Sequence, residues 1–277
     1  MPLQLNDIAH NLCLNEHGIY TTGNFQPISY PEKGNEYCFE LEDNSFWFQH
    51  RSSCIAAAVE QFVPNSIFFD VGGGNGYVTK SLQNKKIKTV LIEPGNNGVL
   101  NAKQRGVQNI IRSNFKDIAF KKNAVKAVGL FDVLEHVEND IGFLEQIKSV
   151  LPKEALIFIT VPAYSFLWSN DDVQAGHFRR YTLKSLEKLL RSQGCSVVRK
   201  SYLFSFLILP IFLMRTIPSI FKKTKKAIDF SKHQNIHQPD TFTLKIIDNV
   251  LNRELDRFKQ GYNLKLGSSC FIVAKVN

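Results

Sequence analysis

Short apolar runs alternate with segments of helical spacing along most of the chain, from about residue 46 to the C-terminus. Glycine, proline or acidic residues bound these runs, which predict seven strands, at 66–72, 89–95, 109–115, 124–137, 154–162, 195–204 and 268–276. Apolar positions three or four residues apart predict helices at 46–63, 76–85, 98–106, 141–151, 182–194 and 243–261. Such alternation indicates an α/β fold in which helices cover both faces of a parallel sheet.

Two parts of the chain depart from this alternation. Residues 1–45 combine little periodicity with many turn-forming residues, which predicts an irregular N-terminal arm. Residues 206–266 separate the sixth strand from the seventh and predict an inserted helical cap with a candidate membrane-contact segment. The α/β core then consists of residues 46–205 and 267–277.

The most apolar stretch of the chain runs from Tyr202 to Met214. Pro210 interrupts it and Arg215 ends it, whereas a membrane span needs about 20 apolar residues. Its first residues are expected to complete the sixth strand. The remainder has two interpretations. It is either a helix buried beneath the cap, or an apolar surface at a membrane or a tunnel mouth, with Lys222–Lys226 on anionic headgroups.

The net charge of the chain is +9 and is unevenly distributed. The window from Arg179 to Lys226 holds twelve Lys or Arg residues and one acid, so it carries +11 and the rest carries −2. A local basic surface suits anionic lipid, a phosphorylated substrate or nucleic acid as a partner, or is simply solvated.

The cysteines and the N-terminal residues bear on the compartment. The five cysteines are scattered and include no CxxC pair, which disfavours a zinc site and a disulfide framework. The N-terminal residues lack the basic and apolar regions of a secretion signal. We therefore expect a cytoplasmic protein, with peripheral contact to the inner face of the membrane as the further option.

A glycine-rich loop follows the first predicted strand of the core, in "FFDVGGGNG". Gly72, Gly74 and Gly76 lie between that strand and a helix, where glycine permits positive φ and a ligand can approach the backbone. The spacing does not match the dinucleotide pattern GxGxxG, because Tyr77 stands where the third glycine belongs. This disfavours an NAD-dependent oxidoreductase.

Two acids end neighbouring predicted strands. Asp70 precedes the glycines and is placed to meet a ligand ammonium group. Glu93 ends the second strand, where a carboxylate in a doubly wound sheet can accept both hydroxyls of a ribose.

These segments resemble, in order, the motifs of class I S-adenosylmethionine-dependent methyltransferases. "FFDVGGGNG", "LIEPG", "SNFKDIAF" and "FDVLEHVEND" are similar to the first four motifs, and the resemblance covers about 45–193 plus the last strand. It implies S-adenosylmethionine as cofactor and a Rossmann-like sheet of seven strands whose last strand runs antiparallel. The cofactor-binding residues that it implies are Asp70, Gly72, Gly74, Gly76, Glu93, Asn114, Phe115, Phe131 and Asp132.

The segment "SFWFQHR" resembles a stretch that covers the cofactor in bacterial members. By that resemblance Trp47 or Phe48 stacks near the cofactor, and Arg51 pairs with its carboxylate. The alternative is that the aromatic residues only pack the first core helix on the sheet.

The loop after the fifth strand carries "GHFRRY", which resembles the GHxRRY stretch of bacterial methyltransferases associated with glycans or lipids. We expect His177 to be a general base or to orient the substrate, and His136 to occupy a similar edge position. Trp168, Arg180 and Tyr181 are the expected substrate contacts. Alternatively, His177 and Arg180 only hold the loop in place. No metal is predicted, because the ligand spacing shows no further pairing.

The interpretation favoured by these residues is an S-adenosylmethionine-dependent methyltransferase acting on a small or lipid-linked acceptor, with O-methylation favoured. One alternative is a nucleic-acid methyltransferase, but "DVLEH" stands where an Asn/Asp-Pro-Pro-aromatic motif would follow the fourth strand. Another is a scaffold that binds the cofactor without turnover.

Overall fold

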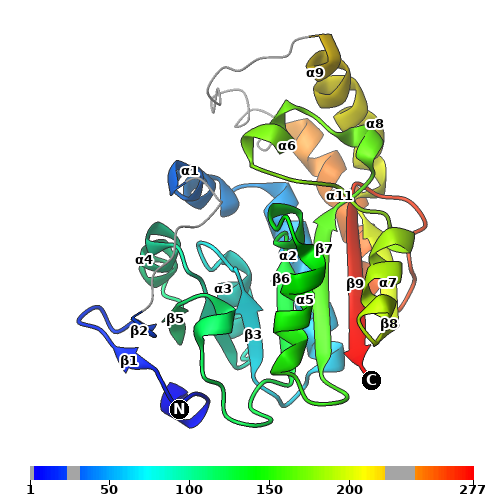
Figure 1. The fold of residues 1–277 in the computed structure, drawn as a ribbon. Helices are drawn as coiled ribbons and strands as arrows, with labels where there is room; N and C mark the ends of the chain where they lie inside the picture. The colour runs from blue at the N-terminus through cyan, green and yellow to red at the C-terminus, as the bar shows by residue number, and fades with distance from the viewer. Residues whose placement is uncertain (1–2, 24–31, 222–240) are drawn as a thin grey trace.

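One mixed sheet organises the computed structural model, which describes residues 3–23, 32–221 and 241–277 (Figure 1). The strand order is β1-β2-β5-β4-β3-β6-β7-β9-β8, where β1 is Cys13–Leu14 and β2 is Tyr20–Thr21. Seven of these strands belong to the α/β core: β3 Phe68–Val71, β4 Thr89–Ile92, β5 Ile110–Arg112, β6 Ala127–Phe131, β7 Leu156–Pro162, β8 Cys195–Leu203 and β9 Ser269–Val276. Each of them falls within a segment predicted to be a strand.

The strand directions create, in the middle of the sheet, the kind of edge at which open α/β sheets bind ligands. From β3 the chain winds outward through β4 to β5, and it then returns to pair β6 with the other side of β3. These strands are parallel, so their carboxyl ends meet at one edge, on either side of a point where the winding reverses. The last strand, β9, lies antiparallel between β7 and β8, which confirms the predicted direction.

The N-terminal residues are more ordered than the sequence suggested. Where an irregular arm was predicted, the described residues contain a 3₁₀ turn η1 (Leu5–Asp7), strands β1 (Cys13–Leu14) and β2 (Tyr20–Thr21), and helix α1 (Glu32–Glu42). Strand β2 pairs with β5, so the sheet has nine described strands and not seven. Strands of two residues are too short to produce an alternating pattern, which explains why the sequence did not indicate them.

Helices pack on both faces of the sheet, as predicted (Figure 1). Helices α2 (Phe46–Phe62), α3 (Tyr77–Asn84) and α11 (Thr241–Lys259) share one apolar core with the strands. Helices α5 (Asp140–Ser149) and α7 (Leu183–Ser192) share the core of the opposite face, and α4 (Asn96–Gln104) packs near the β4–β5 end. Adjacent β3 residues serve different cores, because Phe68 belongs to the apolar cluster that includes α2 and Phe69 belongs to the cluster of the opposite face.

The apolar stretch is divided between the sheet and a helical segment. Strand β8 takes its first residues, and the chain continues through η5 (Ser205–Leu207), α8 (Ile208–Ile211), the π-helical turn η6 (Phe212–Thr216) and α9 (Ile217–Phe221). We refer to Ile208–Phe221 as the apolar rod. Among the described residues no helix combines the length and hydropathy that a membrane crossing requires. Lys222–Lys226 lie outside the described residues.

A buried carboxylate joins three elements where β8 ends. Phe204 adopts a left-handed conformation with φ 60°, and its N–H donates to Glu254 of α11 at 2.6 Å. Glu254 also accepts from the N–H and hydroxyl of Ser205, each at 3.1 Å, and pairs with His50 of α2 at 3.0 Å. These bonds hold the pKa of Glu254 below its usual value although burial pushes it upward.

Replacing Glu254 with alanine should therefore destabilise the protein strongly. The Glu254→Ala variant leaves buried N–H groups and His50 without their acceptor, so we expect the free energy of unfolding to fall by about 3 kcal/mol. Urea unfolding measures this. Glu145→Ala, at an exposed position of α5, is the matched control and should change stability by less than about 0.5 kcal/mol. Equal effects in the two variants would contradict the assigned role.

Candidate functional site

The glycine loop lies at the carboxyl edge of β3 and is tightly packed. Gly72, Gly74 and Gly76 all adopt positive φ, between 53° and 70°, which side chains with a Cβ rarely tolerate. A Cβ on Gly73 would lie 2.5 Å from the Leu91 side chain, so the loop fits against β4 only without one. The sequence motif therefore corresponds to a real backbone constraint at the ligand-binding edge.

Asp70 and Glu93 are buried at the ends of β3 and β4. The Thr79 hydroxyl donates to Oδ2 of Asp70 at 2.6 Å, while Oδ1 is buried without a hydrogen-bond partner among the described residues. Glu93 accepts from the N–H groups of Gly74 at 2.9 Å and Gly95 at 2.7 Å. Burial raises the pKa of Asp70 to about 6 and that of Glu93 to about 7. Both carboxylates retain acceptor capacity for a polar ligand.

Arg51 and Asp132 form a buried ion pair at the same edge. Asp132 follows β6 with φ 56°, pairs with Arg51, and accepts a hydrogen bond from the Thr160 hydroxyl at 2.9 Å. The guanidinium of Arg51 lies 4.5 Å from the Trp47 ring centre, and Trp47 stacks on Phe204 at 5.6 Å. The expected cofactor-covering residues thus reach this edge. Arg51 is already engaged by Asp132, although its Nε is buried without a partner in the described part.

The remaining expected cofactor residues contribute differently. The Asn114 amide donates to Asp117 at 3.3 Å, next to the end of β5. The side chains of Phe115 and Phe131 are buried, against Phe120 and Phe68 respectively, with ring centres 5.0 and 6.1 Å apart. Their rings are therefore part of the core.

Asp172 organises the loop that carries the GHxRRY stretch. It lies in α6 (Asn170–Gln174) and accepts from Nδ1 of His177 at 2.8 Å. Arg180 donates to both oxygens of the same carboxylate, at 2.8 and 2.9 Å. Despite burial, these bonds lower the pKa of Asp172 to about 2, so it is ionised at neutral pH. With Nδ1 on Asp172, His177 retains Nε2 for another partner.

Glu135 and His136 lie beside this network, in the 3₁₀ turn η3 (Leu134–His136) after β6. The rings of His136 and His177 meet edge to face with centres 4.6 Å apart. Burial, and secondarily the charge of His177, lowers the pKa of His136 to about 4, so its imidazole is neutral near pH 7. Burial raises the pKa of Glu135 to about 8, and its Oε2 has no hydrogen-bond partner in the described structure. The structure thus brings both candidate catalytic histidines together with a buried carboxyl group.

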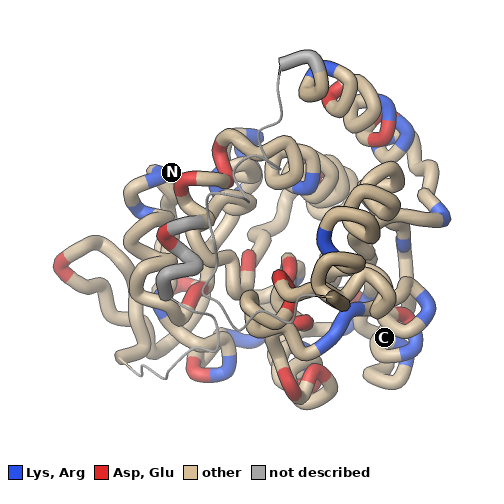
Figure 2. The backbone as a smooth tube through the Cα atoms, turned by 90° about the horizontal axis from the view of Figure 1, so that it is seen from above, with Lys and Arg blue, Asp and Glu red and all other residues tan. Residues whose placement is uncertain are grey.

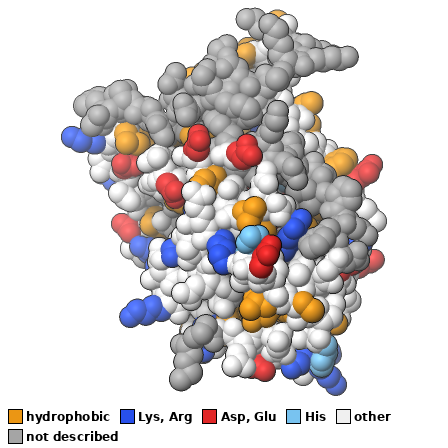
Figure 3. Space-filling model, turned by 90° about the vertical axis from the view of Figure 1, so that its left-hand side faces the viewer, with side chains coloured by type: hydrophobic (Ala, Val, Ile, Leu, Met, Phe, Trp, Pro, Cys, Tyr) orange, Lys and Arg blue, Asp and Glu red, His pale blue; other side chains and the backbone are white. Residues whose placement is uncertain are grey.

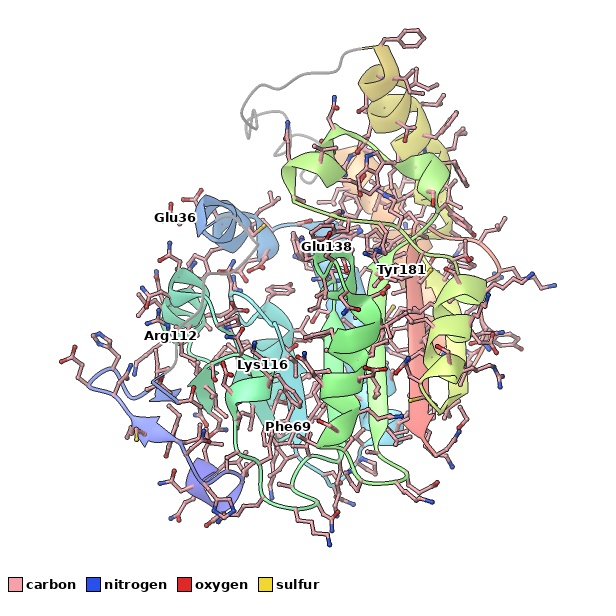
Figure 4. All side chains as sticks on the ribbon, viewed as in Figure 1. Glu36, Phe69, Arg112, Lys116, Glu138 and Tyr181 are labelled. Atoms are coloured by element: carbon pink, nitrogen blue, oxygen red, sulfur yellow. The ribbon has the colours of Figure 1, made fainter. Side chains whose placement is uncertain are left out.

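The expected substrate contacts differ in their placement. Tyr181 is buried and donates to Asp140 at 2.8 Å, and Figure 4 shows it toward the upper end of the sheet. Arg180 is held by Asp172 and by the Ala163 carbonyl at 3.2 Å, while Trp168 is half-buried before α6. Tyr181 and Arg180 thus make these contacts within the fold, and their contact with a substrate stays a prediction.

The apolar rod covers this loop. Arg215 pairs with Asp171 at 3.4 Å, and the Asn170 N–H donates to the Ser219 hydroxyl at 3.0 Å. The rings of Phe166 and Phe212 lie 6.3 Å apart. In Figure 1 the rod stands above α6 at the top of the molecule. The apolar rod therefore packs against the loop that carries His177.

The charges of the basic window are largely paired where they are described. Of its cations, Arg179, Arg180, Arg191, Lys200 and Arg215 bind acidic side chains. Figure 2 looks down on the sheet edge and shows several acidic segments near its centre. On the described part of the face in Figure 3, acidic and basic side chains are interspersed. These five cations of the window therefore form ion pairs within the described fold.

Known proteins share this fold and part of this sequence. The family described as "Methyltransferase domain" matches residues 48–200. A plantazolicin methyltransferase, BamL, solved with a desmethyl plantazolicin analogue and SAH, has 16% identity and a TM-score of 0.52, covering 90% of this chain and 92% of its own. A possible histamine N-methyltransferase from Thermotoga maritima has 14% identity and a TM-score of 0.52, with coverages of 88% and 96%.

A third similar structure is phosphoethanolamine N-methyltransferase 2 from Haemonchus contortus with S-adenosyl-L-methionine. It has 14% identity and a TM-score of 0.52, covering 92% of this chain and 61% of its own. No curated protein sequence matches the chain. At these identities the solved structures establish the fold.

The buried Asp70 should make stability depend on pH in a specific way. Its folded pKa, about 6, exceeds the ordinary value near 4, so its contribution to stability is lost as pH rises through 6. Asp70→Asn removes this ionisation. We expect the variant to match the wild type at pH 4 and to be more stable by about 2 kcal/mol at pH 8. Denaturant unfolding across this range measures the difference.

The matched control is Asp248→Asn, at an exposed position of α11. It should show the wild-type dependence on pH. A variant Asp70→Asn that is less stable than the wild type at pH 8 would contradict the assignment of Asp70 as a buried, energetically costly carboxylate.

Proposed function

The chain belongs to the family of methyltransferase domains, and on that premise we propose that it methylates a hydroxyl group of a small, apolar or lipid-linked acceptor. It is an S-adenosylmethionine-dependent methyltransferase. The observation that carries the acceptor proposal is the pairing of His177 with Asp172 beside an apolar rod. A base and an apolar wall suit a hydroxyl on a hydrophobic acceptor.

The residues at the sheet edge fit S-adenosylmethionine. Oδ1 of Asp70 is an unpartnered buried acceptor for the ammonium group, and Glu93 has acceptor capacity for ribose hydroxyls. The Gly72–Gly76 loop lets the cofactor approach the backbone. We propose three further contacts to the cofactor. Arg51 pairs with its carboxylate, Trp47 covers one of its faces, and Asn114 contacts its adenine. When bound, S-adenosylmethionine supplies a methyl group already activated by the sulfonium charge.

The chain's own task is to orient the acceptor and remove its proton. We assign proton removal to Nε2 of His177, because Asp172 occupies Nδ1 and stabilises the imidazolium that forms. The acceptor oxygen would then gain the methyl group as the bond from that group to the cofactor sulfur breaks, which leaves S-adenosylhomocysteine. The acceptor's proton would stay on Nε2 of His177 until it passes to solvent. His136, neutral at pH 7, lines the same space. Trp168 is proposed to contact the acceptor's apolar part.

Loss of His177 should abolish turnover without abolishing cofactor binding. For His177→Ala we expect kcat/KM to fall about 10²- to 10⁴-fold, and affinity for S-adenosylmethionine to change less than about threefold. Transfer of tritiated methyl groups into lipid and aqueous extracts of the source cells measures turnover. Label is expected in the lipid extract. His10→Ala, at an exposed position, is the control. Full activity of His177→Ala would remove it from the chemistry, and label only in polar products would refute the apolar acceptor.

We further propose that the apolar rod contacts anionic membrane, which would bring a cytoplasmic enzyme to a lipid-linked acceptor. Leu209, Leu213 and Ile220 are 63%, 51% and 65% exposed, at intervals that place them along one side of a helix. The lysines of Lys222–Lys226 follow directly in the sequence. Apolar side chains beside cations suit a surface of anionic headgroups.

Vesicle flotation tests the membrane proposal. The triple variant Leu209→Ser, Leu213→Ser and Ile220→Ser should lower partitioning onto phosphatidylglycerol vesicles about 100-fold, because each apolar side chain contributes about 1 kcal/mol. Ile141→Ser removes a side chain that is 48% exposed on α5 and should bind as the wild type. Wild-type protein that stays off anionic vesicles, or a triple variant that binds equally, would refute the contact.

A further inference from the structure

Three potential metal ligands converge where η3 meets the His177 loop. A carboxylate oxygen of Glu135 and one ring nitrogen each of His136 and His177 all lie within 4.8 Å of one another. Ligand bonds to zinc are about 2.0–2.2 Å long, so ligand atoms on one ion lie about 3–4 Å apart. Side-chain rotations that move each ligand atom by about 1 Å therefore suffice to bring the three atoms onto one ion. We propose that Glu135, His136 and His177 bind a single divalent transition-metal ion.

The surroundings of His177 suit a metal ligand as well as a base. Its Nδ1 is held by Asp172, whose other bonds to Arg180 fix the carboxylate in place. Histidines that bind metals typically use the second ring nitrogen in this way, which orients the ring and strengthens the ligand. Nε2 of His177 is then the coordinating atom, and the acid that fixes it comes from the same loop.

Glu135 gives a second, independent indication of a ligand. Its side chain is 1% exposed, and Oε2 has no hydrogen-bond partner among the described residues. A buried carboxylate oxygen without a donor is costly, and a bound cation would offset that cost. Two imidazoles and one carboxylate are a ligand set typical of zinc and of other first-row divalent ions. Three protein ligands also leave a coordination position open, as in catalytic sites.

The metal proposal deepens the proposed function and rests on it only for the role of the open position. An acceptor hydroxyl bound there would have a lowered pKa, and the ion would take over the part otherwise assigned to Nε2 of His177. Metal binding itself requires neither cofactor nor acceptor. It can therefore fail or succeed separately from methyl transfer.

Direct titration of the folded, metal-stripped protein with Zn²⁺ tests the site. Calorimetry should show one tight equivalent per chain, and Co²⁺ should give the visible absorption of a site with nitrogen and oxygen ligands and no thiolate band. Glu135→Gln and His177→Ala should each weaken Zn²⁺ binding more than 100-fold. Asp172→Asn should weaken it about 10- to 100-fold, because it removes the group that orients His177.

The controls distinguish this site from other side chains of the protein that could bind Zn²⁺. Cys13 is exposed, so titrations use the Cys13→Ser background. His233 and His237 lie outside the described residues, and their double replacement by alanine should leave the tight equivalent unchanged. Circular dichroism verifies that each variant is folded. Absence of tight Zn²⁺ and Co²⁺ binding in the wild type, or unchanged binding in folded Glu135→Gln and His177→Ala, overturns the proposal.

Discussion

The buried charge of Arg51 is the interaction on which the carboxyl edge of the sheet depends. Its guanidinium pairs with Asp132, and it also attracts Glu42, Asp70 and Glu135. Burial pushes the pKa of Asp70 and Glu135 upward, and the arginine partly opposes that push. Because α2 carries Arg51 and its neighbour Trp47 stacks on Phe204, one helix joins the edge that holds Asp70 to the turn after β8. Without this cation the edge would hold several mutually repelling acids.

The same edge of the sheet contains features that lower the stability of the folded chain. Asp70 and Glu135 each keep a buried oxygen without a donor in the described structure, and Gly72, Gly74 and Gly76 hold a backbone that few residues tolerate. Sites of this kind are typically preorganised for a ligand, and packing elsewhere in the protein offsets the stability that they cost. Here the offset comes from two apolar cores and from well-paired groups such as Glu254, which joins α2, α11 and the turn after β8.

The sequence predicted what short-range patterns encode. Apolar runs and glycine spacing located the core strands and the loop after β3, and the spacing of apolar residues located α7 within the predicted segment 182–194. Pairings between distant residues left no signal, as with Arg51 and Asp132 or Glu254 and Phe204. Helix α1 is polar and was missed, since its stability comes partly from Arg105, which binds Glu42 at 2.6 Å. The role of Asp172 became evident only from the fold, in which its carboxylate binds both His177 and Arg180.

The central claim is that the edge shared by Asp70, Glu93 and Arg51 binds S-adenosylmethionine. Isothermal titration of the purified protein with S-adenosylmethionine, S-adenosylhomocysteine and NAD tests it most directly. The structure and the family predict saturable binding of the first two ligands, with one equivalent per chain, and no comparable binding of NAD. No binding of either adenosyl ligand at millimolar concentration, or tighter binding of NAD, would contradict it.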